Sequence, residues 1–357
     1  MKLNNLAIAT LAFGLAGTAN AGLFDADLST AELMVVVGSP SAAGIAGALP
    51  YVDLGANLYT GTVQLQVDGY RYCSGSLLSS GRHILTAAHC VTNEDGSMPA
   101  SFAGHTIQFD GPSGSEDISF AGVVAHEGWT YDYTGTGNDL AIVTLSSAAP
   151  EWATRYDLYT GEAVGQDYTR IGYGSFGFGD TGAIYGGIGS VDNLLRVFGS
   201  NHFDVGNAEL CYMFGAHCGG GGVLGSDFDS LIDTNGDGIG DHDLFGHLFN
   251  DFDGGNLNYV HGATAMEVNS APGDSGGTLL VNGQLAGITS WGWTVGCYVD
   301  ASCPQGNETN SSWGELAVDT SVAFHYDWIN AHAIPVPAPL ALMGFSLLAF
   351  GLVRRRR

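Results

Sequence analysis

Residues 273–289 read Gly273-Asp274-Ser275-Gly276-Gly277-Thr278-Leu279-Leu280-Val281-Asn282-Gly283-Gln284-Leu285-Ala286-Gly287-Ile288-Thr289. Two apolar runs flank the dipeptide Asn282-Gly283, which is the strongest short-range signal for a β-hairpin because both residues tolerate a positive φ. We therefore predict two antiparallel strands that begin shortly after the glycine-bounded Ser275.

The same signature of short strands and glycine turns recurs upstream. Val63, Leu65 and Val67 alternate with polar residues, as in a half-buried strand, and Asp68-Gly69 supplies a tight turn. Glycine accounts for 55 of the 357 residues, about twice the average share of roughly 7%. This pattern predicts an all-β barrel or sandwich. Further apolar runs are His83–Thr86, Gly122–Ala125 and Leu140–Leu145.

One helix is predicted, close to the end of this β-rich region. Thr320 or Ser321 can cap a segment Val322–His332, in which apolar side chains recur four residues apart. We therefore expect a single C-terminal helix beside the strands.

The charge of the chain excludes one broad class of function. Asp and Glu number 36 and Lys and Arg only 10, which gives a formal net charge of -26. A generic nucleic-acid binder needs a surplus of cations to neutralise phosphates, so we expect no nucleic-acid partner. Between the two ends of the chain, the Lys and Arg residues are five arginines: Arg71, Arg82, Arg155, Arg170 and Arg196.

Three polar side chains in separate segments together suit nucleophilic catalysis. A serine hydroxyl such as that of Ser275 is a poor nucleophile until a base takes its proton. Histidine titrates closest to neutrality, so His89 can take that proton, and a carboxylate such as Asp139 would fix the tautomer of His89. Gly273 and Gly276 permit a backbone bend that aims N–H groups at a developing oxyanion.

The serine motif alone fits two folds. Gly273-x-Ser275-x-Gly277 also matches the nucleophile elbow of α/β-hydrolases, in which the serine precedes the acid and the histidine. Only His325 and His332 follow Ser275, and both lie on the predicted helix. The order found here, histidine then aspartate then serine, is that of the chymotrypsin arrangement, and the β-rich pattern agrees with it.

Together these segments resemble the trypsin/chymotrypsin-like serine proteases. The resemblance runs from about residue 62 to residue 332 and rests on the combination of segments. It implies an all-β fold of two packed six-stranded antiparallel β-barrels with a C-terminal helix, and a catalytic triad in the cleft between the barrels. The matching segments are Cys73–Leu78, Thr86–Cys90, Asn138–Ile142, Gly172–Gly174, Gly273–Gly277 and Ser290–Gly292.

The resemblance assigns a catalytic role to each member of the site. It implies His89 as the base, Asp139 as the group that orients it, and Ser275 as the nucleophile. The N–H groups of Gly273 and Ser275 would form the oxyanion hole.

The resemblance also implies where substrate binds. Asn269 falls where the family places the floor of the primary specificity pocket, and a neutral side chain there argues against a strict Arg or Lys preference. Ser290, Trp291 and Gly292 would form the strand that pairs with the substrate backbone.

Six cysteines in an exported chain indicate disulfides, and six cysteines allow fifteen pairings. Proximity along the chain favours Cys211–Cys218 and Cys297–Cys303, which leaves Cys73–Cys90. The last pair also matches the disulfide that braces the histidine loop in this family. Ala271 stands where the family usually has a further cysteine beside the pocket.

Residues 22–61 are predicted to be an N-terminal or propeptide-like segment. In the family, Asp274 pairs with a new N-terminus that zymogen cleavage frees. The best local match to that hydrophobic terminus is Ile45-Ala46-Gly47-Ala48, and Val36-Val37-Gly38-Ser39 competes with it. Neither stretch follows a basic residue.

The two ends carry predicted targeting segments. Residues 1–21 have the apolar run and the Ala19-Asn20-Ala21 cleavage pattern of a secretory signal peptide. Residues 334–357 hold a proline-rich linker, an apolar run Leu340–Val353 and four arginines, and they resemble a PEP-CTERM sorting signal with Ala338 in place of the usual Glu. This resemblance implies envelope sorting, at least transient anchoring by a transmembrane segment, and a sorting protease that acts on the tail.

Residues 62–333 are predicted to form the protease domain, with a long loop insertion at about 175–260 that is rich in Gly and Asp. Inside it, Asp233-x-Asn235-x-Asp237-Gly238 copies the first half of a calcium loop, and Asp241 fits its ninth position. Leu244 stands where such a loop has its bidentate Glu. The stretch is therefore either a structural calcium site or an acidic turn.

Triad chemistry itself requires no cofactor. We expect an exported serine endopeptidase that hydrolyses protein or peptide substrates through an acyl-enzyme. The alternative is a catalytically silent, protease-fold binding protein of the cell envelope or extracellular matrix, with its affinity in the acidic 175–260 insertion.

Overall fold

The computed structural model describes most of the region that the sequence assigns to a folded domain, and its residues lie in one compact unit, Glu32–Arg357. No helix in this described part is long and apolar enough to cross a membrane. The predicted apolar segment Leu340–Val353 and the predicted signal peptide lie outside the described residues. The described residues are 35–38, 40–53, 57–131, 137–183, 196–214, 221–230, 232, 234, 240–246, 262–294 and 309–333.

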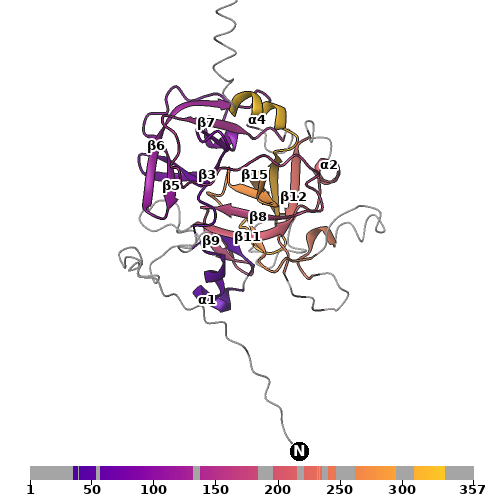
Figure 1. Ribbon diagram of the computed structural model, residues 1–357. Helices are drawn as coiled ribbons and strands as arrows, with labels where there is room; N and C mark the ends of the chain where they lie inside the picture. The colour runs from indigo at the N-terminus through magenta and orange to yellow at the C-terminus, as the bar shows by residue number, and fades with distance from the viewer. Residues whose placement is uncertain are drawn as a thin grey trace, which may run out of the picture. The chain divides into compact units, whose positions relative to one another are not determined.

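Six antiparallel strands close into a barrel in the order β2-β3-β4-β7-β6-β5 (Figure 1). The predicted turn at Asp68-Gly69 joins the first two, with φ of 50° and 81°. Apolar side chains such as Leu65, Ile84 and Ile142 fill the interior. The strands are β2 (Thr62–Val67), β3 (Tyr70–Leu77), β4 (His83–Thr86), β5 (His105–Gly111), β6 (Gly114–Ala125) and β7 (Ala141–Leu145).

A second set of six antiparallel strands runs in the order β11-β8-β14-β15-β16-β12 and curls into a half-barrel without closing. Asn282 and Gly283 have φ of 51° and 79°, which confirms the predicted hairpin. Thr278 joins the two halves, because its hydroxyl lies 2.8 Å from that of Thr62 and 2.6 Å from that of Ser76. The strands are β8 (Asp167–Gly172), β11 (Val197–His202), β12 (Val223–Asp227), β14 (Thr278–Val281), β15 (Gln284–Trp293) and β16 (Leu316–Ser321).

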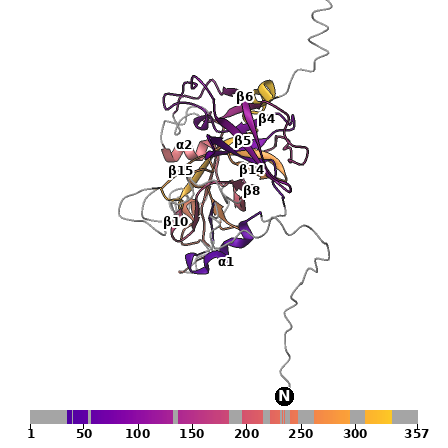
Figure 2. The ribbon, with the colours of Figure 1, turned by 90° about the vertical axis from the view of Figure 1, so that its left-hand side faces the viewer.

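A smaller sheet of order β10-β9-β1-β13 incorporates part of the segment before the predicted protease domain. Strand β1 (Val35–Val37) pairs in parallel with β9 (Phe176–Phe178) and antiparallel with β13 (Val268–Asn269). Strand β10 (Gly182–Ala183) forms the edge beside β9. Figure 2 shows β10 at the end of the unit opposite β4, β5 and β6.

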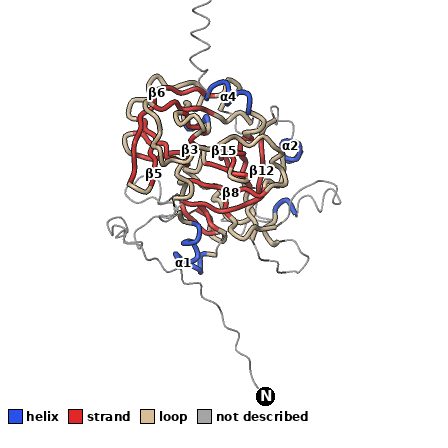
Figure 3. Tube along the Cα trace, viewed as in Figure 1, coloured by secondary structure: helices blue, strands red, loops and turns tan. Residues whose placement is uncertain are grey.

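Helices are few and short, and strands predominate (Figure 3). The predicted C-terminal helix is present as α4 (Tyr326–Ala333) but begins four residues later than expected. Val322 is the reason, because its N–H donates to the carbonyl of Ala286 and keeps the chain against β15. The other helical elements are η1 (Ser41–Ala43), α1 (Gly44–Ala48), η2 (Leu49–Tyr51), η3 (Ala88–Cys90) and α2 (Asn207–Phe214).

The predicted chymotrypsin-like architecture is therefore confirmed, with one closed barrel, a second six-stranded system and a C-terminal helix. The second system differs in detail from the expected closed barrel, since its end strands β11 and β12 are not paired with each other.

Candidate active site

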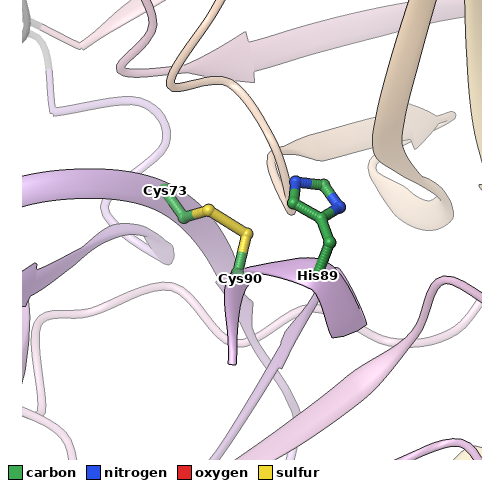
Figure 4. Close-up of side chains that lie close together, drawn as sticks. All are labelled: Cys73, His89 and Cys90. Carbon is green, nitrogen blue, oxygen red and sulfur yellow. A yellow bond between two sulfur atoms is a disulfide. The ribbon is translucent and has the colours of Figure 1, made fainter. Parts of the chain in front are cut away.

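His89 lies on η3, the short turn that follows strand β4. The adjacent Cys90 is joined to Cys73 of β3 by a disulfide, and Figure 4 shows the His89 ring close to that bond. The disulfide ties the histidine turn to the barrel wall, as the family resemblance implies. Because both sulfurs are bonded to each other, the proximity of Cys73, His89 and Cys90 is not a metal site.

Asp139 lies two residues before β7 and is 3% exposed. Its Oδ1 accepts a hydrogen bond of 2.9 Å from the backbone N–H of His89, and its Oδ2 lies 2.7 Å from Nδ1 of the same residue. A carboxylate can only accept, so this contact places a proton on Nδ1 and leaves Nε2 of His89 as the basic nitrogen.

Ser290 supplies a third hydrogen bond to this carboxylate. Its hydroxyl donates to Oδ2 of Asp139 at 2.5 Å. The register of β15 against β16 shifts between Thr289 and Trp291, so Ser290 has no partner across that ladder. Sequence reasoning placed Ser290 on the substrate strand and missed this contact with Asp139.

Two opposing effects set the pKa of Asp139. Burial acts to raise it, but the charge of His89 and the hydrogen bonds from His89 and Ser290 outweigh burial. The pKa of Asp139 therefore lies below its ordinary value, and the carboxylate is ionised at neutral pH.

Ser275 lies on a tight loop that only glycines can complete. Gly273 and Gly276 have φ of 102° and 78°, and a Cβ on Gly276 would lie 2.4 Å from the carbonyl oxygen of Ser74. The carbonyl of Ser275 accepts a hydrogen bond of 2.8 Å from the N–H of Ser74. The same oxygen lies 3.7 Å from Sγ of Cys90, so the loop is held against the segment that carries His89.

The loop also presents two free backbone donors. Within the described residues, the N–H groups of Gly273 and Ser275 have no hydrogen-bond acceptor. Asp274, between them, is fully buried, and its carboxylate accepts from the N–H groups of Gly174 at 2.7 Å and Ala271 at 2.9 Å. This anchored side chain fixes the orientation of the loop on both sides.

Burial raises the pKa of Asp274 to about 6, although backbone hydrogen bonds and the charges of Arg170 and Arg71 act to lower it. Val36, in one of the two candidate N-terminal stretches, lies in β1 opposite Asn269. Ile45, in the other, lies in α1. The structure thus brings the Val36 stretch, rather than the Ile45 stretch, to the pocket strand.

The predicted pocket residues lie on β13 and β15. Asn269 is 2% exposed, and its side-chain oxygen accepts from the N–H of Ser270. Trp291 packs against an apolar cluster that includes Leu210 and Phe245, and Gly292 is exposed. Among the described strands, β14 pairs with β15 only as far as Ile288. Residues 291–293 pair on their other side with Leu316–Val318 of β16.

Several predicted site residues lie outside the described part of the chain. Cys218, Cys297 and Cys303 are outside it, as is the side chain of Cys211, so the two local disulfides stay predictions. Of the predicted calcium loop, Asp233, Asn235 and Asp237 are also outside it. The carboxylate of Asp241 is described, and it accepts from the N–H and the hydroxyl of Thr234.

Comparison with known proteins identifies the family to which this chain is similar. The profile of the family described as Trypsin matches residues 56–184 and 257–303. Glucanase inhibitor protein 3 of Phytophthora sojae (strain P6497) is 30% identical over 204 residues, which span 55% of this chain and 74% of the relative. The chain belongs to the trypsin family. The residues between the two matched ranges fall within the insertion predicted at about 175–260.

Other relatives of this trypsin-family chain are named as trypsins or serine proteases. Trypsin I-P1 of Gallus gallus is 28% identical over 235 residues, which span 64% of this chain and 71% of the relative. The solved structure of neuropsin, a serine protease expressed in the limbic system of mouse brain, aligns with a TM-score of 0.51 and 16% identity. That alignment covers 80% of this chain and 99% of neuropsin, and at such low identity it shows the shared fold alone.

Proposed function

We propose that this trypsin-family chain is an exported serine endopeptidase that cleaves protein or peptide substrates. The observation that carries the proposal is the carboxylate of Asp139, which binds both the backbone and Nδ1 of His89. A buried carboxylate that fixes a histidine tautomer beside a glycine-bounded serine suits acyl transfer.

In the proposed reaction, the hydroxyl of Ser275 attacks the scissile carbonyl while Nε2 of His89 takes its proton. The N–H groups of Gly273 and Ser275 would stabilise the oxyanion, and each such donor is worth about 3–4 kcal/mol of barrier. His89 then returns the proton to the leaving amine, which leaves an acyl-enzyme. A water molecule deprotonated by His89 hydrolyses the acyl-enzyme and regenerates Ser275.

The substrate preference follows from the pocket residues. Asn269 offers a neutral amide at the pocket floor, so we expect no strict requirement for Arg or Lys beside the scissile bond. Residues 290–293 of β15, beyond the part of that strand that pairs with β14, would hold the substrate backbone as an added strand.

The two ends of the chain complete the proposal. Residues 1–21 would direct export, and residues 334–357 would direct envelope sorting, with transient anchoring and removal by a sorting protease. These roles rest on the sequence patterns alone.

Cleavage of a peptide library tests the proposal. The purified chain should hydrolyse internal peptide bonds, and Ser275→Ala and His89→Ala should each abolish hydrolysis while retaining the wild-type melting temperature. Ser79→Ala, an exposed hydroxyl change, is the matched control and should retain full activity. Hydrolysis that survives Ser275→Ala would refute the assignment of the nucleophile.

One observation favours a second function, a protease-fold binding protein. A relative at 30% identity carries the name glucanase inhibitor protein. A binding protein predicts affinity for an envelope or matrix component that Ser275→Ala leaves unchanged, together with no hydrolysis by the wild-type chain.

A further inference from the structure

Four buried carboxylates gather beyond the end of strand β12, away from the catalytic residues. We name Asp227, Asp229, Asp243 and Glu267 the acid cluster, and each is at most 4% exposed. One carboxylate oxygen from each of the three aspartates lies within 4.8 Å of the others. Such density of negative charge inside a protein is costly, and either protonation or a bound cation relieves it.

The fold holds these side chains in place from three separate segments. Asp227 ends β12, and its Oδ2 accepts a hydrogen bond of 2.8 Å from the N–H of Phe245. Asp243 accepts from the N–H of Gly246. Glu267 directly precedes β13, and its Oε2 accepts from both the N–H and the hydroxyl of Thr264 at 2.6 Å. The carboxylates are therefore oriented before any ligand binds.

Two oxygens of the acid cluster are buried without a hydrogen-bond donor. They are Oδ1 of Asp229 and Oε1 of Glu267, each on a side chain that is 4% exposed. Arg170 and Arg196 are bound to other carboxylates, Arg170 to Asp319 and Arg196 to Asp53. An unpaired buried carboxylate oxygen is costly, so these atoms are free to act as ligands.

The electrostatics of the acid cluster also favour a bound cation. Burial raises the pKa of Asp229 well above its ordinary value, and the charges of Asp227 and Asp243 raise it further. Burial and the charge of Asp243 raise the pKa of Asp227 to about 7. The carboxylates repel one another, and a cation placed among them would relieve that repulsion.

We propose that Asp227, Asp229 and Asp243 bind one calcium ion, with the carboxylate of Glu267 adding negative charge beside them. An all-oxygen set of carboxylates suits a hard cation, whereas zinc favours nitrogen and sulfur. Ligands on opposite sides of a calcium ion lie about 4.8 Å apart, because each Ca–O distance is about 2.4 Å. The spacing of the three aspartates meets this requirement.

This site is distinct from the calcium loop predicted at Asp233–Asp241. Among the described residues of that loop, the Asp241 carboxylate bonds to Thr234. The acid cluster instead joins β12 and the turn at Asp243 to Glu267, two residues before Asn269 of the pocket strand. The bound ion would therefore fasten the turn at Asp243 to the end of β12, beside Glu267.

Calorimetric titration with calcium chloride tests the proposal. The protein used is the full chain with the Ser275→Ala substitution, so that self-digestion does not contribute. The chain should bind one calcium ion, and calcium should raise its melting temperature relative to EDTA. Asp229→Asn and Glu267→Gln should each weaken affinity at least about tenfold. Asp157→Asn, which changes an exposed carboxylate, is the matched control and should leave the affinity unchanged.

The same variants separate the acid cluster from its alternatives. In EDTA, Asp229→Asn should melt at or above the temperature of the parent chain, because it removes repulsion, and this shows that the variant folds. Absence of binding by the parent chain up to about 10 mM calcium, above the range of roughly 10⁻⁴–10⁻³ M for extracellular modules, would overturn the proposal. Binding lost in Asp237→Asn but retained in Asp229→Asn and Glu267→Gln would also overturn it.

Discussion

The hydroxyl of Ser290 donates a 2.5 Å hydrogen bond to Oδ2 of Asp139. The same oxygen lies 2.7 Å from Nδ1 of His89, so one buried atom receives both contacts. Ser290 is brought there by the register shift in β15, 151 residues along the chain from Asp139. The strand that would hold substrate thus also positions the carboxylate that binds His89.

Removing this hydroxyl should slow catalysis without disassembling the site. Ser290→Ala takes away a hydrogen bond to a charged group, worth about 1.5–3 kcal/mol, and should lower kcat/KM by about tenfold or more. Steady-state kinetics would measure the change. Thr294→Ala on the same segment is the control, because the Thr294 hydroxyl contacts Thr309 rather than the triad. Equal losses in both variants would contradict a specific role for Ser290.

The N-terminal strand β1 should stabilise the domain. Val36 is fully buried and packs with Phe228, Ala271 and Trp313. Val36→Ala should lower the free energy of unfolding by about 2–3 kcal/mol. Val124→Ala, at a side chain that is 43% exposed, should change it by less than about 0.5 kcal/mol. Denaturant unfolding of both variants checks this, and equal stability of the Val36 variant and the wild type would contradict it.

Asp274 should make the unfolding free energy depend on pH. Burial raises its pKa from 3.8 to about 6. Between these values the folded chain holds a proton that the unfolded chain has lost, so stability should fall as pH rises from about 4 to about 6. The contribution of this one residue is about 3 kcal/mol.

The comparison that isolates this contribution uses Asp274→Asn in the unprocessed chain. The difference in unfolding free energy between wild type and variant should change by that amount between pH 4 and pH 7, to the disadvantage of the wild type at higher pH. A difference that stays constant with pH would show that the Asp274 carboxyl has an ordinary pKa.

A single substitution in the buried pair of Arg170 and Asp319 should lower the free energy of unfolding. Both side chains are fully buried and are joined by hydrogen bonds of 2.9 and 3.1 Å. Arg170→Met leaves Asp319 without its cation and should cost about 3–5 kcal/mol. Arg170→Met combined with Asp319→Leu should cost less than the sum of the single changes, as a double-mutant cycle of urea unfolding would measure. Additive losses would contradict this coupling.

Local chemistry made much of the fold predictable. Asp68-Gly69 and Asn282-Gly283 adopt the positive φ values that their residue types allow, and both hairpins form where expected. The strands around them follow from apolar runs of short period. The family resemblance then supplied the pairing of His89 with Asp139, which no local pattern contains.

The features that were missed depend on contacts between distant segments. Strand β1 is three residues long, and its partners Phe176–Phe178 and Val268–Asn269 lie far along the chain. Nothing in its own sequence distinguishes it from a propeptide.

The acid cluster was missed for the same reason. Asp243 is brought to Asp227 and Asp229 only by tertiary packing, whereas the sequence pattern pointed to the adjacent loop at Asp233–Asp241. The start of α4 was displaced because Val322 bonds to Ala286 instead of entering the helix.

Mass spectrometry of the chain after exposure to a fluorophosphonate tests the central claim, an assembled Ser-His-Asp triad, most directly. We predict a single adduct, located on Ser275, that is absent in His89→Ala and strongly reduced in Asp139→Asn. A correctly folded chain that forms no adduct, or an adduct on Ser275 that persists in His89→Ala, would contradict it.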